Sequence, residues 1–574
     1  MRPILRRSAA VPRDPRLAAL HPVLQRVYAA RGVLDAGEVD HRLRHLAAPD
    51  GMGGLASAVA LLAEALAAQQ RIVVVGDFDA DGATGTAVAV RGLRLLGARD
   101  VGFKVPNRVV HGYGLSPALV AELRAEALAL LLTVDNGIAA HAGVAAARAA
   151  GMRVIVTDHH LPGATLPDAD AIVDPCLPGD AFPSKALAGV GVVFYVLLAL
   201  RAALRAKGWF GPDRAEPDLS VLLDLVALGT VADLVPLDRN NRVLVAAGLR
   251  RMQAGEASAG VRALIAVSGR EAARLVASDL GFALAPRINA AGRLEDMALG
   301  IQCLLCDDEA QARPLAARLD AINRERRVIQ ADMQAQAEAL AAPWLAREPR
   351  GLPAGVCLYD PAWHAGVVGL VASRLKDRLQ RPVVALAPAE EGSAMLKGSG
   401  RSIEGFHLRD ALADIAAAEP DLMERFGGHA MAAGLSLPRA HLERFVAAFA
   451  ARAQAALGSA PEVQPVETDG SLDAAMATLE LAALLATAGP WGQGFPEPTF
   501  DDEFEVRGWR VMAERHLKLD LAWAACGTAV EAVHFGGYAG CAPPPRLRLV
   551  YQLAIDEWRG ARRLRLLVRH AVPA

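Results

Sequence analysis

Lysine, cysteine and long apolar runs are all scarce in this chain of 574 residues. Only six of its 61 basic residues are lysine, and 63 acidic residues leave a formal net charge of −2. That balance excludes a polybasic coat over the whole protein. A nucleic-acid partner remains compatible with it, because arginine is a good bidentate phosphate ligand and a local arginine-rich groove can exist under a balanced total charge.

The six cysteines are scattered, which argues against a disulfide framework and favours a reducing, cytoplasmic compartment. The N-terminus carries charge without a following apolar core, unlike a signal peptide. The longest apolar run, residues 186–200, is too short and too rich in glycine to predict a membrane span. With 53% hydrophobic and 22% charged residues, the chain is expected to form several folded domains without a membrane anchor.

Four short apolar runs in the N-terminal third each end at an aspartate. They cover residues 71–75, 128–134, 153–157 and 171–173, and helical patterns rich in Ala and Leu separate them. Buried β-branched runs that alternate with helices predict a parallel, doubly wound α/β sheet. Because the active crevice of such a sheet lies beyond the carboxyl ends of its strands, we expect the four aspartates to converge there.

The rest of the chain predicts a second α/β block and a β domain. Apolar residues at helical spacing over 307–345 predict one long amphipathic helix that connects two lobes. Strand-like runs at 355–359 and 382–386 follow, and the Gly-rich segments 398–402 and 426–434 are expected to be turns. Short alternating stretches from about residue 499 predict a small antiparallel β-barrel.

The densest acidic cluster is GDFDADG, which places Asp77, Asp79 and Asp81 within five residues. Three carboxylates this close repel one another unless a cation neutralises them. If the segment is nearly extended, alternation puts all three side chains on one side, where they can converge. An Asp-rich solvated turn is the alternative, but a solvated turn has no reason to recur at four strand ends.

Further carboxylates and two imidazoles stand at the other strand ends. TVDNG supplies Asp135, a candidate to bridge two cations, and VTDHH supplies Asp158, His159 and His160. A carboxylate beside a metal-ligating histidine can fix its tautomer. Sites dominated by carboxylates with one or two imidazoles suit Mn²⁺ or Mg²⁺, and two such ions about 3.5–4 Å apart are a common device for phosphodiester hydrolysis.

Taken in order, DFDADG, TVDNG, TDHH and GTVAD resemble motifs I to IV of the DHH phosphoesterase superfamily. Five further segments narrow the resemblance to the bacterial exonucleases of that superfamily that are specific for single strands, from about residue 45 to the C-terminus. These segments are VPNRVVHGYGL (105–115), APRINAAGRL (285–294), WHAGVVGLVASRL (363–375), GSGRS (398–402) and FGGHAMAAG (426–434).

The resemblance assigns catalytic, metal-binding roles to six residues: Asp79, Asp81, Asp135, His159, His160 and Asp233. It places Asp77 as a further metal ligand or close support, and Asp158 as a support. Asp224, upstream of Asp233, is the weaker candidate for the fourth motif. Asn136 stands where some relatives carry Cys, a difference that leaves the ligand set intact.

The implied fold is α/β: a parallel-sheet DHH domain joined by a long helix to a second α/β, DHH-associated domain, with a C-terminal OB-like β-barrel. The expected segments are an N-terminal segment (1–45), the DHH phosphoesterase domain (46–250), a helical connector (251–345), the DHH-associated domain (346–460) and the OB-like nucleic-acid-binding domain (465–574).

A metal site alone does not select a chain end, so polarity needs a second site. A GSGRS turn would offer backbone N–H groups freed by glycine, the Ser399 hydroxyl and the Arg401 guanidinium. The resemblance implies that Arg108, Ser399 and Arg401 hold a 5′-terminal phosphate and that His429 lies near the scissile phosphate. Three further candidates for DNA contact lie together in PRINAAGR: Arg287, Asn289 and Arg293. For any single arginine, an ordinary surface position is the alternative.

Aromatic residues in the C-terminal region have two interpretations. For most of the six a place in the core is favoured, because small barrels need aromatic filling: Trp491, Phe495, Phe500, Trp509, Trp523 and Phe535. A barrel that stacks on bases and follows the backbone charge would also supply affinity for single strands.

The resemblance thus implies a metal-dependent exodeoxyribonuclease that degrades single-stranded DNA 5′→3′, releases 5′-mononucleotides with two Mn²⁺ or Mg²⁺ ions, and acts in DNA repair and recombination. Single-stranded DNA is the expected partner, with a single-strand-binding protein and a helicase as further partners and a monomer as the default. Two alternatives stay open. A nano-RNase or cyclic-dinucleotide phosphodiesterase would be a shorter two-lobe chain, and a DNA-binding scaffold with a vestigial metal site would have lost ligands.

Overall fold

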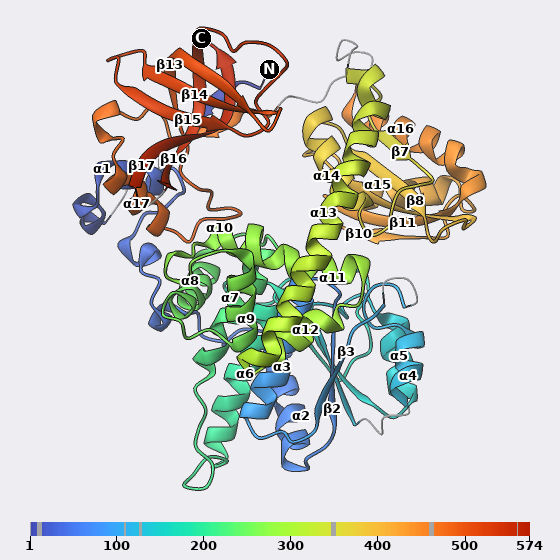
Figure 1. The fold of residues 1–574 in the computed structure, drawn as a ribbon. Helices are drawn as coiled ribbons and strands as arrows, with labels where there is room; N and C mark the ends of the chain where they lie inside the picture. The colour runs from blue at the N-terminus through green and yellow to red at the C-terminus, as the bar shows by residue number, and fades with distance from the viewer. Residues whose placement is uncertain are drawn as a thin grey trace. The chain divides into compact units, whose positions relative to one another are not determined.

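The computed structural model describes residues 2–8, 14–107, 111–124, 129–345, 352–458, 464–558 and 561–574. Its contacts divide the chain into two compact units, each with its own β-sheet (Figure 1). The first unit combines Met1–Asn289, Met297–Ala317 and Gln464–Ala574, and the second combines Ala290–Asp296 with Arg318–Val463.

A five-stranded parallel sheet in the order β3-β2-β4-β5-β6 forms the centre of the first unit. Its strands are β2 (Ile72–Gly76), β3 (Val101–Lys104), β4 (Leu130–Val134), β5 (Arg153–Thr157) and β6 (Ala171–Val173). All residues of β2 and β4 are buried, as expected for strands covered on both faces. The predicted parallel, doubly wound sheet is therefore confirmed. Only the edge strand β3 was not predicted, because VGFK is short and mostly half-buried.

Helices cover both faces of this sheet. α4 (Pro117–Leu123) and α5 (His141–Ala149) pack on one face, whereas α2 (Leu55–Ala67), α3 (Ala80–Leu95) and α6 (Gly189–Ala206) lie on the other (Figure 1). Among the described residues, α6 is the one helix long and apolar enough to cross a membrane by length and composition. Most of α6 is buried against α2, α3 and α7 (Leu223–Ala232), which is the setting of a core helix.

The other helices of the first unit are α1 (Pro22–Ala29), α7 (Leu223–Ala232), α8 (Arg239–Gln253), α9 (Ala259–Ser268), α10 (Ala277–Asp279), α12 (Ala298–Leu305) and α17 (Leu479–Thr487). Of these, α17 packs on the C-terminal barrel. α11 (Ala285–Leu294) and α13 (Glu309–Leu345) each continue from the first unit into the second. α13 is the long helix predicted from the apolar spacing over 307–345.

A closed barrel forms the C-terminal part of the first unit, in the order β13-β14-β15-β17-β16. Its strands are β13 (Phe500–Met512), β14 (His516–Trp523), β15 (Ala529–His534), β16 (Arg546–Trp558) and β17 (Ala561–Pro573). The barrel was predicted to be antiparallel, but its closing pair, β15 and β17, is parallel. These two strands are separated by one strand in the sequence, so they run in the same direction.

The N-terminal segment packs against the residues that lead into this barrel. β1 (Ile4–Arg6) pairs in parallel with β12 (Val466–Thr468), and the Tyr28 hydroxyl donates to the carbonyl of Ala488 at 2.7 Å. Four of the six aromatic residues singled out in the C-terminal region are buried, whereas Trp509 and Phe535 are exposed.

The second unit is built on a mixed sheet in the order β10-β11-β9-β8-β7. The strands are β7 (Val356–Tyr359), β8 (Val383–Pro388), β9 (Met395–Arg401), β10 (Arg425–Gly428) and β11 (Ala432–Pro438). α14 (Val368–Leu379) packs on one face, and α15 (Leu408–Ala418) and α16 (Leu442–Leu457) pack on the other. The first two strands match the apolar runs predicted at 355–359 and 382–386.

The GSGRS segment does not form the expected turn, because residues 398–401 lie inside β9, the central strand of this sheet. β9 pairs with β8 on one side and β11 on the other, so its backbone N–H groups belong to the sheet. A Cβ at Gly400 would lie 2.7 Å from Leu408 Cδ2. The glycine therefore serves close packing in the core and not a turn, while FGGHAMAAG does form the hairpin between β10 and β11.

Candidate metal centre

The first acidic motif is the connection between β2 and α3. Asp79 is the N-cap of α3, and its Oδ1 accepts hydrogen bonds from the backbone N–H groups of Asp81 at 2.9 Å and Gly82 at 3.0 Å. Gly82 is required here, because a Cβ would lie 2.5 Å from the backbone N and O of Asp77. The segment is thus not extended as predicted. The helix begins at Ala80 and separates Asp81 from Asp77 and Asp79.

Asp81 is buried in the first turn of α3 and faces the N-terminus of α6. Its two carboxylate oxygens accept from the backbone N–H groups of Gly189 at 2.6 Å and Val190 at 3.0 Å. Burial, together with the neighbouring charge of Asp79, raises the pKa of Asp81 to about 7. A Cβ at Gly189 would lie 2.5 Å from Asp135 Cβ, so the start of α6 packs directly against the next strand end.

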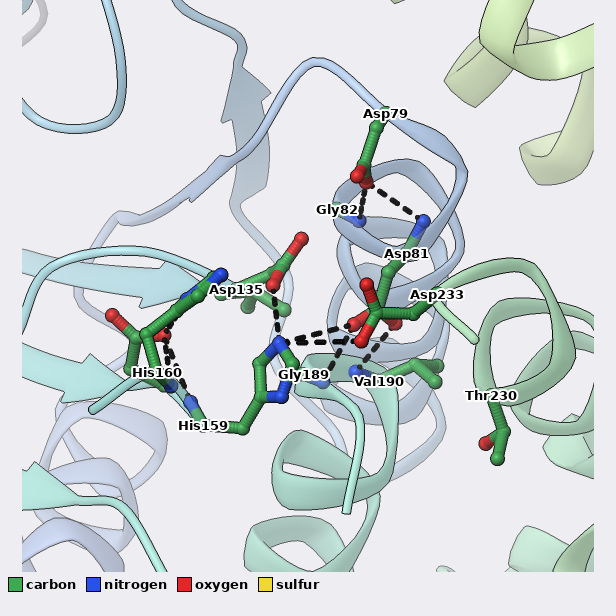
Figure 2. A network of polar contacts seen from close by, with 12 residues as sticks. Asp79, Asp81, Gly82, Asp135, His159, His160, Gly189, Val190, Thr230 and Asp233 are labelled. Atoms are coloured by element: carbon green, nitrogen blue, oxygen red, sulfur yellow. Dashed lines mark hydrogen bonds and ion pairs between the residues drawn. The ribbon is translucent and has the colours of Figure 1, made fainter. Parts of the chain in front are cut away.

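His159 stands between three carboxylates from three different elements (Figure 2). Its Nε2 lies 3.1 Å from Asp135 Oδ1, 3.5 Å from Asp233 Oδ2 and 3.9 Å from Asp81 Oδ2. Asp135 follows β4, His159 follows β5, and Asp233 is the C-cap of α7. Burial and the nearby carboxylates hold the pKa values of Asp135 and Asp233 well above the ordinary range of an aspartate.

Asp158 positions both histidines through hydrogen bonds. Its Oδ1 accepts from the backbone N–H groups of His159 and His160 and pairs with His160 Nδ1 at 2.7 Å. Its Oδ2 accepts from the backbone N–H of Ile138 at 2.9 Å. Burial opposes the ionised form of Asp158, but the hydrogen bond and charge of His160 outweigh it and lower the pKa of Asp158. The same pair raises the pKa of His160 to about 9 against the effect of its burial.

Three overlapping groups of metal donors result, in each of which the donor atoms lie within 4.8 Å of one another. The groups are Asp77 with Asp79 and Asp135, Asp135 with His159 and His160, and Asp81 with His159 and Asp233. Carboxylates whose pKa values are raised by burial and by mutual repulsion form an environment in which a divalent cation relieves the repulsion. A set of mostly oxygen donors with two imidazoles suits Mn²⁺ or Mg²⁺.

Two aspartates that the sequence placed near this site lie outside the three donor groups. Asp224 is buried at the start of α7, where its Oδ2 accepts from the backbone N–H of Ser258 at 2.7 Å. Asp174 follows β6, and its Oδ1 accepts from the backbone N–H of Cys176 at 2.8 Å. Three strand ends therefore contribute to the donor groups, and the fourth does not. Asn136 is also structural, since its amide donates to the carbonyls of Val75 and Val134.

Tyr113 borders the site but was not singled out from the sequence. Its hydroxyl donates to the carbonyl of Asp135 at 3.2 Å, and its ring stands edge-on to the rings of Phe78 and His160. Gly112 and Gly114, both with positive φ, flank it and let the chain make the tight loop. These two glycines in HGYGL were the available signal in the sequence.

In the second unit, Ser399 and Arg401 lie on the face of β9 that packs on α14. The Arg401 guanidinium donates to Ser399 Oγ at 2.9 Å and to the carbonyl of Gly400 at 2.8 Å. A Cβ at Gly369, in the first turn of α14, would lie 2.8 Å from Ser399 Oγ and 3.0 Å from Arg401 Nη2. A hydroxyl and a guanidinium therefore meet the positive end of a helix dipole, which favours an anion.

The remaining candidates for phosphate contact have varied settings. Arg108 lies outside the described residues. Arg287 is buried, and its guanidinium donates to the carbonyls of Ala283 and Val267, which favours a structural role. Asn289 accepts from the backbone N–H of Ala80 at 2.8 Å, beside the first acidic motif. In the second unit, Arg293 donates to the carbonyl of Gly366, and His429 is exposed in the β10–β11 hairpin.

Three family models match the chain. The DHH family, N-terminal domain, matches residues 71–230, the DHHA1 domain matches 353–455, and the RecJ OB domain matches 468–570. Among curated relatives, the single-stranded-DNA-specific exonuclease RecJ of Dickeya dadantii is 52% identical over 559 residues, covering 97% of this chain and 96% of the relative. The Escherichia coli protein of the same name is 49% identical over 560 residues, with coverage of 97% and 96%.

The fold also resembles solved structures of RecJ from Thermus thermophilus. The complex with Mn²⁺ has a TM-score of 0.80 at 32% identity and covers 100% of this chain and 80% of that one. The complex with Mg²⁺ has a TM-score of 0.74 at 30% identity, with coverage of 99% and 78%. The donor set described above and these two ions agree with the predicted divalent cofactor. This chain therefore belongs to the RecJ family of metal-dependent exonucleases within the DHH superfamily.

Proposed function

We propose that this chain hydrolyses single-stranded DNA from its 5′ end, releases 5′-mononucleotides by a two-metal mechanism, and acts in DNA repair and recombination. The observation that supports the mechanism most is that the donor groups overlap. Asp135 belongs to two of them, and His159 belongs to two. Shared donors are what a pair of neighbouring cations needs.

In this proposal, Asp77, Asp79 and Asp135 would hold one cation, Asp81, His159 and Asp233 would hold the other, and Asp135 would be shared between the two. Two such cations, when bound, activate a water and stabilise charge on the phosphate and on the leaving 3′ oxygen. The chain's own contribution is orientation. The N–H groups of α6 fix Asp81, the helix-capping bonds fix Asp79, and Asp158 holds His160 through Nδ1, which makes Nε2 of His160 the nitrogen suited to a cation or a phosphate.

For polarity, we propose that Ser399 and Arg401 bind the terminal 5′ phosphate at the start of α14. The arrangement that supports this is a guanidinium, a hydroxyl and a helix N-terminus on one side of β9. We also propose Arg108 as a ligand of the 5′ phosphate, on the family resemblance alone. His429 is proposed to lie near the scissile phosphate. Arg287, Asn289 and Arg293 stay proposed DNA contacts on the family resemblance, and each also makes a hydrogen bond within the protein.

We also propose the predicted segments as the domains of the chain. Each of the three family matches lies inside one of them: 71–230 within 46–250, 353–455 within 346–460, and 468–570 within 465–574.

The direct test is a cleavage assay with Mn²⁺ on end-labelled single-stranded and duplex oligonucleotides. Immediate release of a labelled mononucleotide from the 5′ end of the single strand alone is the expected result. Release from the 3′ end, or activity confined to oligomers of a few nucleotides, would contradict the proposed polarity and substrate. Metal-independent binding without cleavage would favour a scaffold.

A matched pair of variants on α7 tests the metal centre in the same assay. Asp233→Asn removes a donor carboxylate and is expected to abolish cleavage. Asp224→Asn changes a buried aspartate of the same helix outside the donor groups, and its amide oxygen can still accept from Ser258. Full activity in Asp233→Asn, or equal loss in both variants, would contradict the proposed ligand set.

A further inference from the structure

Two of the three most exposed large apolar side chains of the described residues directly follow residues of the metal donor groups, and the third lies in the turn 280–284 that packs on α7. Phe282 is 79% exposed, Leu234 is 70% exposed and Leu161 is 67% exposed, and no other described large apolar residue exceeds these fractions. Leu161 directly follows His160, and Leu234 directly follows Asp233. Exposed apolar side chains scattered singly need no explanation, but their concentration beside one site does.

Leu234 is also held in a strained backbone conformation. Its φ of 62° lies in the left-handed region that leucine rarely adopts, and it is one of six such non-glycine residues in the described chain. Leu234 occupies the position just after the C-cap of α7, where helices usually place glycine. The protein thus keeps a strained leucine where glycine would fit better, although its side chain is largely in solvent and adds little to the core.

Phe282 and Tyr113 lie on two segments that pack beside these residues, one against α7 and one against His160. Phe282 lies in the π-helical turn Leu280–Leu284, which packs on α7, since the Cβ position of Gly281 is 3.4 Å from Val231 Cγ1. Such turns occur often at functional sites. Tyr113 is 53% exposed although its hydroxyl is bonded to the carbonyl of Asp135. We call Tyr113, Leu161, Leu234 and Phe282 the apolar rim.

We infer that the apolar rim contacts the unpaired bases next to the scissile phosphate and so selects single-stranded substrate at the site of cleavage. The inference rests on the proposed function. It concerns the bases of the substrate, which the metal centre does not recognise. A phosphate at the metal centre brings its attached nucleotides to the residues that directly follow Asp233 and His160. All four bases present apolar faces, so the contact tolerates any sequence. In a duplex those faces are stacked inside the helix.

Substitutions of Leu234 separate the side chain from the backbone strain. Leu234→Gly relieves the strain and removes the apolar group, so we expect Tm to rise by about 1–3 °C while kcat/KM on single strands falls about tenfold. Leu234→Ala should lose the same activity without the gain in Tm, and Leu234→Met should retain it. Gln380→Gly is the matched control, because Gln380 also has a positive φ of 53°, at the C-terminus of α14, and should gain stability with unchanged cleavage.

The substrate supplies the second arm of the test. Wild-type protein should cleave an oligonucleotide with abasic residues at its two 5′-terminal positions about tenfold less efficiently than the normal strand. Leu234→Ala should treat the two substrates alike. If Leu234→Ala matches wild type on normal DNA, or loses equally on both substrates, the rim does not contact bases and the inference is overturned.

Failure of the proposed function would be distinguishable from failure of this inference. A wild-type protein that cleaves no single strand contradicts the proposed function directly. The role of the apolar rim is then tested by binding. The anisotropy of labelled normal and abasic oligonucleotides is measured with Ca²⁺ in place of Mn²⁺, and the two affinities are compared. A preference for the normal strand that disappears in Leu234→Ala supports the inference, and equal affinity of wild type for both strands overturns it.

Discussion

The two sheets of this protein carry their polar motifs in different ways. In the parallel sheet, DFDADG, TVDNG and TDHH begin where β2, β4 and β5 end, and the shared chain direction brings Asp77, Asp135 and His159 to one edge. In the mixed sheet, GSGR lies inside β9, so alternation sends Gly398 and Gly400 into the core and Ser399 and Arg401 to the α14 face. Residues that follow parallel strands therefore lie together at one edge of the sheet, whereas residues within a strand alternate between its two faces.

Asp135→Asn is the strongest way to break the parallel-sheet site, because Asp135 joins two donor groups. Removal of supporting groups around a metal already lowers activity 10- to 100-fold, so loss of a shared ligand should lower kcat at least about 10³-fold. The metal-free variant should be more stable than metal-free wild type, since the pKa of Asp135 is raised by burial and by its carboxylate neighbours. Single-turnover kinetics and denaturant unfolding in a chelator measure the two effects. Wild-type kcat would contradict the shared-ligand role.

Metal removal should have a pH-dependent effect on stability. The pKa of Asp81 is raised from 3.8 to about 7, and those of Asp135 and Asp233 are raised as well. Between about pH 4 and 7 the folded metal-free protein therefore binds more protons than the unfolded chain, and its stability falls as pH rises. Cations at about 100 times Kd restore about 2.7 kcal/mol, and affinity grows as the carboxyl groups ionise.

Differential scanning with Mg²⁺ and with chelator, at pH 5.5 and pH 8, measures this coupling. The difference in Tm between the two conditions should be larger at pH 8. A difference that is constant or shrinks with rising pH would show that these carboxyl groups are not where the cation binds.

The sequence was enough to place the donors of the metal centre near one another. Strands that alternate with helices pair in parallel, so their carboxyl ends lie at one edge of the sheet. It was not enough to assign them to groups. Side-chain alternation predicts an extended segment from Asp77 to Asp81, but Asp79 caps α3 and the helix turns Asp81 toward the N-terminus of α6. That partner is more than 100 residues away in the chain, and no local pattern indicates it.

In the mixed sheet, the glycine pattern gives a wrong prediction for a related reason. The glycine-rich pattern around Gly398 and Gly400 predicts a turn, yet both residues lie in a central strand against leucine side chains of β8, β11 and α15. Glycine permits tight turns and close packing alike, and only the tertiary contacts distinguish them. Leu234 and Phe282 carry no signal in the sequence either. Whether a leucine or phenylalanine is exposed depends on the tertiary fold around it, which no local pattern indicates.

Arg401→Ala tests whether the polar face of β9, in the mixed sheet, recognises the 5′ phosphate. Loss of a charge-assisted contact costs about 1.5–3 kcal/mol, so the preference for a 5′-phosphate over a 5′-hydroxyl end should fall about 10- to 100-fold. Cleavage of a 5′-hydroxyl strand should change little. Arg378→Ala, at the other end of α14 where Arg378 pairs with Glu338 at 2.7 Å, is the control and should keep the preference. Equal behaviour of the two variants would remove Arg401 from phosphate recognition.

Gly400→Ala tests whether the glycines of β9 serve packing alone. The added methyl group would lie 2.7 Å from Leu408 Cδ2 and 3.3 Å from Val384 Cγ2, so one leucine terminus must move. Overpacking of this kind costs about 1–3 kcal/mol, and the low end applies because a side-chain terminus can give way. Gly434→Ala, in the neighbouring strand β11 with its closest contact at 3.9 Å, should cost nothing measurable. Denaturant unfolding compares the two. If Gly400→Ala instead abolishes the 5′-phosphate preference at unchanged stability, the backbone of β9 takes part in recognition and the two sheets are more alike than their topologies indicate.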